Sequence, residues 1–174
     1  MEGNSYLTCP SALSDRVTVR ILSDSHFVQR LLRLNLSRLA ATYEVTVQFL
    51  DTHGIPFCGG VNAGFFVWVD LFAPLRKQMG HLWPEKDLWA VEENLHRTLL
   101  KHKVFLASGK AFGGDVPGWF RIVFAHPERY LREGLERIIQ GLSAYRRQLG
   151  QGGYVQDGDT KAPGRGVLGE SAKL

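Results

Sequence analysis

Arg121 is the residue whose type and surroundings point most directly to chemistry. It lies within the apolar run of residues 119–125, directly after the Pro-Gly pair at residues 117–118. Pro-Gly marks a turn, and the aromatic and β-branched residues that follow predict a short strand. Side chains alternate between the two faces of a strand. One face is therefore predicted to cover a core with Phe120, Ile122 and Phe124, while the other presents Arg121.

A guanidinium group on such a face suggests a carboxylate-binding site. Its planar set of N–H donors matches the two oxygens of a carboxylate, so it can fix both position and orientation. The same pattern also fits a solvent-facing or salt-bridged arginine on an ordinary amphipathic strand. Because exposed arginines are common, alternation alone favours this second interpretation.

Lys110 is the other candidate, within a glycine-rich segment at residues 108–114. A Schiff-base lysine needs a desolvated pocket and an acidic partner for the cofactor, and this segment offers neither. A phosphate-binding loop would need glycine at Val104 and serine or threonine at Ala111. The sequence therefore predicts a solvated loop lysine here.

The remaining polar candidates are predicted to be structural. Asp70 ends an apolar run and is expected to cap or stabilise a turn. His96 and His102 are six positions apart, so they do not share a helix face at metal-ligand spacing. We therefore predict no catalytic residue and no metal-binding residue in this sequence.

Composition indicates a globular protein and narrows its partners. The 174 residues are 44% hydrophobic and 22% charged, with a formal net charge of +4. The lysines and arginines are scattered, so no nucleic-acid partner is expected. No apolar stretch approaches the ~20 residues of a membrane span. Cys9 and Cys58 are expected to be free thiols, and no secretory signal is recognisable, which predicts a cytoplasmic protein.

Three segments are expected along the chain. Residues 1–20 are interpreted as a loose lead-in, residues 21–150 as one domain, and residues 151–174 as a disordered tail rich in glycine and polar residues. Within the domain, three helices are predicted: one capped at Ser23 and running to His53, one opening at Pro84, and one from Pro127 to Gly150.

Four short strands are predicted between these helices, at residues 55–58, 63–71, 104–107 and 119–125. The 63–71 run is almost continuously apolar, which predicts burial on both faces or nearly so. A small sheet with helices over it is a two-layer α/β domain. The predicted sheet is short and mainly antiparallel, and about three helices cover it.

Two motifs then resemble a known family, the class I/II aminotransferases. Asn-Ala-Gly-Phe-Phe-Val-Trp-Val-Asp-Leu at residues 62–71 and Pro-Gly-Trp-Phe-Arg-Ile-Val-Phe-Ala at residues 117–125 are similar to two strands of its 1-aminocyclopropane-1-carboxylate synthase-like branch. Supporting similarities are Asn35, Arg38 and Leu39, the Gly-Ile-Pro at residues 54–56, and residues 133–138. The resemblance covers about residues 21–148.

The resemblance implies the small, C-terminal domain of a fold type I enzyme that uses pyridoxal 5′-phosphate. It places Arg121 where such enzymes bind the α-carboxylate of an amino-acid substrate, which makes the carboxylate-binding interpretation the favoured one. Implied partners are an amino acid and either the missing large domain or a homologous subunit.

The sequence departs from this family at the cofactor. The family's Schiff-base lysine lies in a Ser-x-x-Lys segment, and none of the seven lysines has that context: 77, 86, 101, 103, 110, 161 and 173. Two hypotheses follow. The chain is a substrate-binding domain that is incomplete and inactive alone, or it is a catalytically dead interaction or regulatory module.

Overall fold

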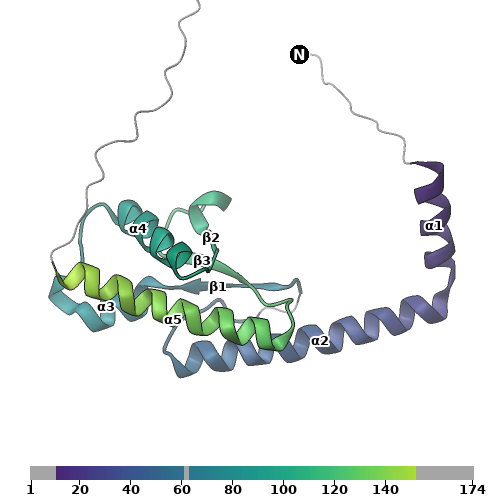
Figure 1. Cartoon of the computed structure of the whole chain (residues 1–174), viewed down its shortest axis with the longest axis horizontal. Coiled ribbons are helices and arrows are strands. Elements are labelled where there is room, and N and C mark those ends of the chain that lie inside the picture. The colour runs from purple at the N-terminus through teal and green to yellow at the C-terminus, as the bar shows by residue number, and fades with distance from the viewer. Residues whose placement is uncertain (1–10, 61–62, 152–174) are drawn as a thin grey trace, which may run out of the picture.

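The structure is a computed structural model and describes residues 11–60 and 63–151. Its helices and strands follow one another in the order α1 (Ala12–Ser23), α2 (Ser25–Thr52), β1 (Phe66–Asp70), α3 (Phe72–Met79), η1 (Gly80–Leu82), α4 (Leu88–Lys101), β2 (Ala107–Ser108), η2 (Gly109–Phe112), β3 (Trp119–Val123) and α5 (Glu128–Gly150). Here η denotes a 3₁₀ helix. A small sheet and the helices packed on it form the mixed α/β body (Figure 1).

The sheet has three antiparallel strands in the order β1-β3-β2, so the strand that carries Arg121 is the central one. Arg121 lies opposite Trp68 on one side and opposite Ala107 on the other. Phe57 adds a single bridge to Val69 at the outer edge of β1. The predicted edge strand at residues 55–58 is thus reduced to one bridge, because Pro56 cannot donate to a ladder.

One face of this sheet forms the core. Val67, Val69, Phe120 and Ile122 are each at most 3% exposed. They belong to a cluster that includes Leu50 of α2, Leu95 of α4 and Leu135 of α5. The predicted orientation of the Arg121 strand is therefore confirmed, and so is the two-layer arrangement.

The opposite face of the sheet is only partly covered, and one prediction fails there. Along β1, Phe66 and Trp68 are half-buried while Val67 and Val69 are buried, so the strand is not buried on both faces. The run reads as fully apolar because the second face carries aromatic residues. In a sequence, aromatic residues on an uncovered face of a sheet look the same as aromatic residues in the core.

A loose lead-in was predicted for residues 1–20, but residues 12–20 are helical. Residues 1–10 lie outside the described residues. Helix α1 has Asp15 in its first turn and Arg20 in its last, and both charges suit the helix dipole. Asp24 then separates the two helices, and its carboxylate accepts a hydrogen bond from the Phe27 N–H at 2.9 Å. Asp24 is therefore the cap, rather than Ser23.

Three further boundaries differ from prediction. Pro84 lies outside α4, which begins only after Asp87, a residue with a left-handed φ of 55°. Helix α3 was not predicted because Pro74 was expected only to end the strand, whereas proline is tolerated in the first turn of a helix. Strand β2 pairs through two residues instead of four. The expected disordered tail lies outside the described residues, apart from Gln151.

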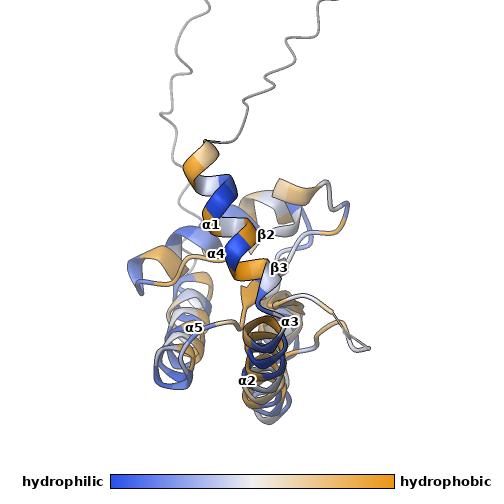
Figure 2. Cartoon of the chain, turned by 90° about the vertical axis from the view of Figure 1, so that its right-hand side faces the viewer, coloured by the Kyte–Doolittle hydropathy of each residue, from blue (hydrophilic) through white to orange (hydrophobic). Residues whose placement is uncertain are grey.

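The helices α1 and the first half of α2 extend away from the body and form what we call the helical arm (residues 12–38; Figure 1). All of its side chains are exposed except that of Val28, which is half-buried. Its exposed apolar residues include Leu22, Leu32 and Leu36, with exposed fractions of 65%, 54% and 66%. Hydrophobic segments alternate with polar ones along the arm (Figure 2).

Candidate functional site

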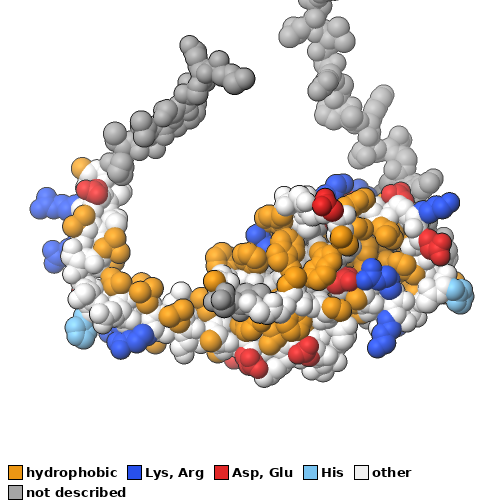
Figure 3. All heavy atoms as spheres, turned by 180° about the vertical axis from the view of Figure 1, so that it is seen from behind, with side chains coloured by type: hydrophobic (Ala, Val, Ile, Leu, Met, Phe, Trp, Pro, Cys, Tyr) orange, Lys and Arg blue, Asp and Glu red, His pale blue; other side chains and the backbone are white. Residues whose placement is uncertain are grey.

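Arg121 projects from the centre of the sheet on the face opposite the core. Its neighbours on the adjacent strands differ in size, with the large ring of Trp68 on one side and the methyl group of Ala107 on the other. The small neighbour leaves space beside the guanidinium. Hydrophobic side chains gather on the face of the body that is seen from behind (Figure 3).

Two phenylalanine rings contact the guanidinium. Arg121 Cζ lies 4.2 Å from the ring centroid of Phe112 and 5.0 Å from that of Phe66. The Phe112 ring in turn meets Trp68 edge to face, with 5.5 Å between centroids. We call Phe66, Trp68 and Phe112 the aromatic bracket. Cation–π contact holds the charged group in place without neutralising it.

The guanidinium has no anionic partner among the described residues. Its Nε–H donor is buried and has no hydrogen-bond acceptor among residues 11–60 and 63–151. By contrast, Arg76 pairs with Asp70 at 2.7 Å, and Asp70 also accepts hydrogen bonds from the backbone N–H groups of Phe72 and Ala73. The predicted capping role of Asp70 is confirmed. Arg121 is therefore a positive charge with an unused donor, which is the requirement for an anion site.

A buried turn fixes where the Arg121 strand begins. Gly118 adopts a φ of +97°, and a Cβ there would lie 2.5 Å from the ring of Phe72. Its N–H donates to the carboxylate of Glu92 at 2.6 Å, and its carbonyl accepts from the N–H of Leu71 at 2.9 Å. These contacts tie the start of β3 to both α4 and the end of β1.

A second glycine-rich segment positions Phe112. The N–H of Gly114 donates to the carbonyl of Gly109 at 2.9 Å, and Gly113 has a φ of +76°. A Cβ at Gly109 would lie 3.3 Å from the Trp119 carbonyl oxygen. Glycine therefore lets this turn close tightly over β3, and it leaves Phe112 at the end of η2, half exposed beside Arg121.

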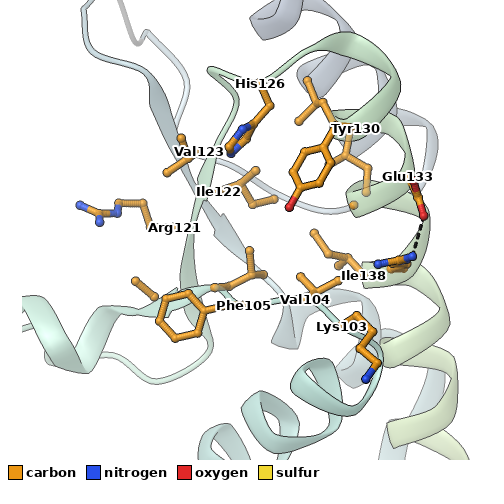
Figure 4. A pocket seen from close by; sticks show the side chains of 16 residues that line it. Lys103, Val104, Phe105, Arg121, Ile122, Val123, His126, Tyr130, Glu133 and Ile138 are labelled. Carbon is orange, nitrogen blue, oxygen red and sulfur yellow. Dashed lines mark hydrogen bonds and ion pairs between the residues drawn. The ribbon is translucent and has the colours of Figure 1, made fainter.

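A cavity of about 590 Å³ has Arg121 among its lining residues. It opens between the segment around Val104 and the first half of α5, and Ile122, Tyr130 and Ile138 contribute to its lining. In Figure 4 the Arg121 side chain points away from these residues. Arg121 therefore borders the cavity, while its guanidinium is directed away from the part that Ile122, Tyr130 and Ile138 line.

The described lysines do not provide a Schiff-base site. Each of them is exposed: Lys77, Lys86, Lys101, Lys103 and Lys110. The Lys110 Nζ lies 5.6 Å from the ring centroid of Trp89, on an open surface. A Schiff-base lysine requires desolvation to be nucleophilic at neutral pH. These residues therefore do not fit pyridoxal phosphate.

Residues 11–60 and 63–151 contain no group of three or more metal-ligating side chains. None of its helices has both the length and the apolar character that a bilayer crossing would require.

The sequence predicts Arg121 as a candidate residue but does not predict the aromatic bracket around it. The continuous apolar run predicts burial of both faces of the strand that carries Phe66 and Trp68, so it does not single out these two residues. Phe112 lies two residues after Lys110, in a segment whose glycines and lysine carry the recognisable sequence signals. The alternation along residues 66–70 was the available signal, because it places Phe66 and Trp68 on the same face.

Known proteins with similar sequences fall in one family. The family described as aminotransferase class I and II matches residues 1–138. The mouse 1-aminocyclopropane-1-carboxylate synthase-like protein 1 is 37% identical over 148 residues, which cover 84% of this chain and 26% of the relative. The mouse probable inactive 1-aminocyclopropane-1-carboxylate synthase-like protein 2 is 30% identical over 84% of this chain and 24% of its own length.

Solved structures show the same fold. An aminotransferase from Mycobacterium tuberculosis superposes with a TM-score of 0.57 at 23% identity, over 80% of this chain and 32% of that one. An aromatic aminotransferase from Pyrococcus horikoshii gives a TM-score of 0.54 at 20% identity, over 75% and 30%. The chain thus spans about a quarter of the length of the curated relatives above. Its fold is that of a part of the aminotransferases with solved structures. Because the family match covers most of the chain, the chain belongs to the class I and II aminotransferase family.

Proposed function

We propose that this chain is the substrate-carboxylate-binding small domain of a pyridoxal-phosphate-dependent enzyme that acts on an amino acid. In this proposal Arg121 binds the carboxylate of the substrate, and the chain is inactive by itself. The family is generally dependent on pyridoxal phosphate, but the cofactor would be held by another part of the enzyme. The single observation that carries the proposal is the unpaired Arg121 guanidinium on the open face of the sheet.

The state of Arg121 supports a binding role over a structural one. A structural arginine normally has its donors satisfied by carboxylates or carbonyl groups, as Arg76 has with Asp70. Arg121 instead has a buried Nε without a partner, and its charge rests against aromatic rings. A bidentate carboxylate would satisfy the guanidinium and orient the ligand at the same time.

The helical arm supports the view that a further protein surface belongs to the functional enzyme. A helix that is apolar on several sides is normally buried. Leu13, Leu22 and Leu36 are instead at least 65% exposed. About three quarters of the length of these relatives lies outside the part that this chain covers, which is enough sequence to supply the covering surface.

Carboxylate binding tests the proposed role of Arg121. Propanoate is titrated into the full chain while the Nε–Hε resonance of Arg121 is followed by NMR. We expect a saturable shift of this resonance in the wild type. The Trp68 and Trp119 indole resonances are followed in the variants, which lack the guanidinium, and should respond more weakly in Arg121→Lys and not at all in Arg121→Met. An equal response of the Trp68 and Trp119 indole resonances in wild type and Arg121→Met would refute the proposal.

The cofactor part of the proposal has its own test. The full chain is incubated with pyridoxal phosphate, reduced with borohydride and mapped by mass spectrometry. Exposed lysines should give only low, distributed labelling. Stoichiometric labelling of a single lysine would show that the chain binds the cofactor by itself, and would contradict its proposed dependence on another domain.

The second candidate is a catalytically dead interaction or regulatory module, and the exposed helical arm favours it equally well. This alternative predicts that the chain co-purifies with a complete family member and changes that enzyme's activity. Loss of this association after polar substitution in the arm, with retention in Arg121→Met, would favour the module over the substrate-binding domain.

A further inference from the structure

We propose that the aromatic bracket makes the Arg121 site selective for carboxylates that carry an aromatic or large apolar group. This inference rests on the proposed function, since it names the class of ligand for the same site. It assigns a specificity-determining role to Phe112 in particular. Phe112 would contact the part of the ligand next to the carboxylate.

The geometry around the guanidinium carries this inference. Phe112 and Phe66 both lie within 5.0 Å of Arg121 Cζ, measured to their ring centroids. A carboxylate must meet the N–H donors at the edge of the guanidinium. The group attached to that carboxylate then lies beside these rings rather than in bulk water. Contact between apolar surfaces is favourable, and aromatic pairs add to it.

The openness of the bracket indicates that it has capacity for a ligand. Phe112 is 52% exposed, and Phe66 and Trp68 are half-buried. The Phe112 ring already has an edge-to-face contact with Trp68, which restrains its orientation. An exposed, oriented ring that touches the binding group differs from the core phenylalanines Phe72 and Phe120, which have no exposed surface.

The backbone that carries Phe112 is specialised to place it there. The hydrogen bond between the Gly114 N–H and the Gly109 carbonyl closes the turn, and Gly109 approaches the backbone of Trp119. A tight turn limits how far the ring can move from Arg121. Preorganisation of this kind lowers the entropic cost of binding.

Three ligands separate the two parts of the inference. 3-Phenylpropanoate and propanoate share the carboxylate and differ by the ring. 3-Phenylpropanamide keeps the ring and lacks the charge. Each is titrated into the full chain, with the Arg121 Nε–Hε and Trp68 indole resonances as readouts. We expect 3-phenylpropanoate to bind about tenfold more tightly than propanoate, and the amide to bind more weakly than 3-phenylpropanoate.

Two variants locate the effect. Phe112→Ala should bring the ratio of 3-phenylpropanoate affinity to propanoate affinity close to one, because the two ligands share the carboxylate and differ only in the ring that Phe112 would contact. Phe105→Ala is the matched control, since Phe105 is 74% exposed and its ring contacts His96 instead. Phe105→Ala should leave the whole ligand series unchanged.

The outcomes distinguish this inference from the proposed function. Equal, Arg121-dependent binding of 3-phenylpropanoate and propanoate would overturn the inference and leave the proposed function standing. Absence of any Arg121-dependent carboxylate binding would overturn both. If 3-phenylpropanoate still bound more tightly than propanoate in Phe112→Ala, the aromatic contact would lie elsewhere and the role of Phe112 would be refuted. The same would follow if the phenyl group favoured binding of the amide to Arg121→Met by an equal amount.

Discussion

The carboxylate of Glu92 accepts a hydrogen bond from the backbone N–H of Gly118, with 2.6 Å between Oε2 and N. Glu92 is 3% exposed and Gly118 is buried, so this contact is shielded from water. It joins α4 to the first residue before β3. The position of Arg121, three residues further on, therefore depends on a carboxylate that is distant in sequence.

Loss of the Glu92 carboxylate should destabilise the fold. In Glu92→Ala the Gly118 N–H loses its acceptor in a buried place, and we expect the free energy of unfolding to fall by about 2–3 kcal/mol. Glu92→Gln keeps an amide oxygen that can accept the bond, so its loss should be smaller. Urea denaturation measures both. Equal losses in the two variants would show that the hydrogen bond is not the cause.

Gly118→Ala should be destabilising for two reasons that act together. The new Cβ would lie 2.5 Å from Phe72 Cγ, and the φ of +97° is unfavourable for a residue with a side chain. We expect a loss of about 2–4 kcal/mol from steric overlap and backbone strain. The measurement is thermal or urea unfolding.

Gly134→Ala is the control for this variant. Gly134 lies inside α5, and a Cβ there meets nothing within 4 Å. Alanine should stabilise the helix by up to about 1 kcal/mol. If Gly118→Ala unfolded no more easily than Gly134→Ala, the turn would be less tightly packed than the structure shows.

Substitutions on the two sides of the chain at β3 and at Phe124, the residue directly after it, should differ in their effect on stability. Phe124→Ala removes a core ring that is 3% exposed, and should cost about 3–5 kcal/mol of stability. Arg121→Met removes a charge held against two rings, and should cost about 1 kcal/mol or less. Comparison of the two unfolding midpoints checks this, and a reversed order would contradict the assigned faces.

The helical arm should contribute little to the stability of the body. Leu32→Gln with Leu36→Gln should change the free energy of unfolding by no more than about 0.5 kcal/mol, because both side chains are exposed. The same pair should lower self-association in light scattering, since it removes exposed apolar surface. Leu135→Ala, at 1% exposure, is the control and should cost about 2–5 kcal/mol.

If Leu32→Gln with Leu36→Gln left self-association unchanged, the helical arm would not be the surface through which the chains associate. A loss of stability as large as that of Leu135→Ala would mean that the arm packs against the body. Either result would weaken the case that another protein surface covers residues 12–38.

Local patterns determined most of the body of this protein. Alternation placed Phe120, Ile122 and Phe124 on the core face, and helical periodicity predicted α5 to its last residue, Gly150. These predictions hold because a strand or helix that buries one face must repeat apolar residues at its own period. The family resemblance rests on the same segments, and the comparisons confirm it.

Only the tertiary structure decided what surrounds Arg121. Phe66 and Phe112 are 46 positions apart in sequence, and no local pattern shows that both rings meet one guanidinium. The link between Glu92 and Gly118 is equally invisible, since a carboxylate inside a helix is ordinarily solvated. Periodicity reports which face of an element is buried, whereas the pairing of distant side chains depends on how the elements are packed.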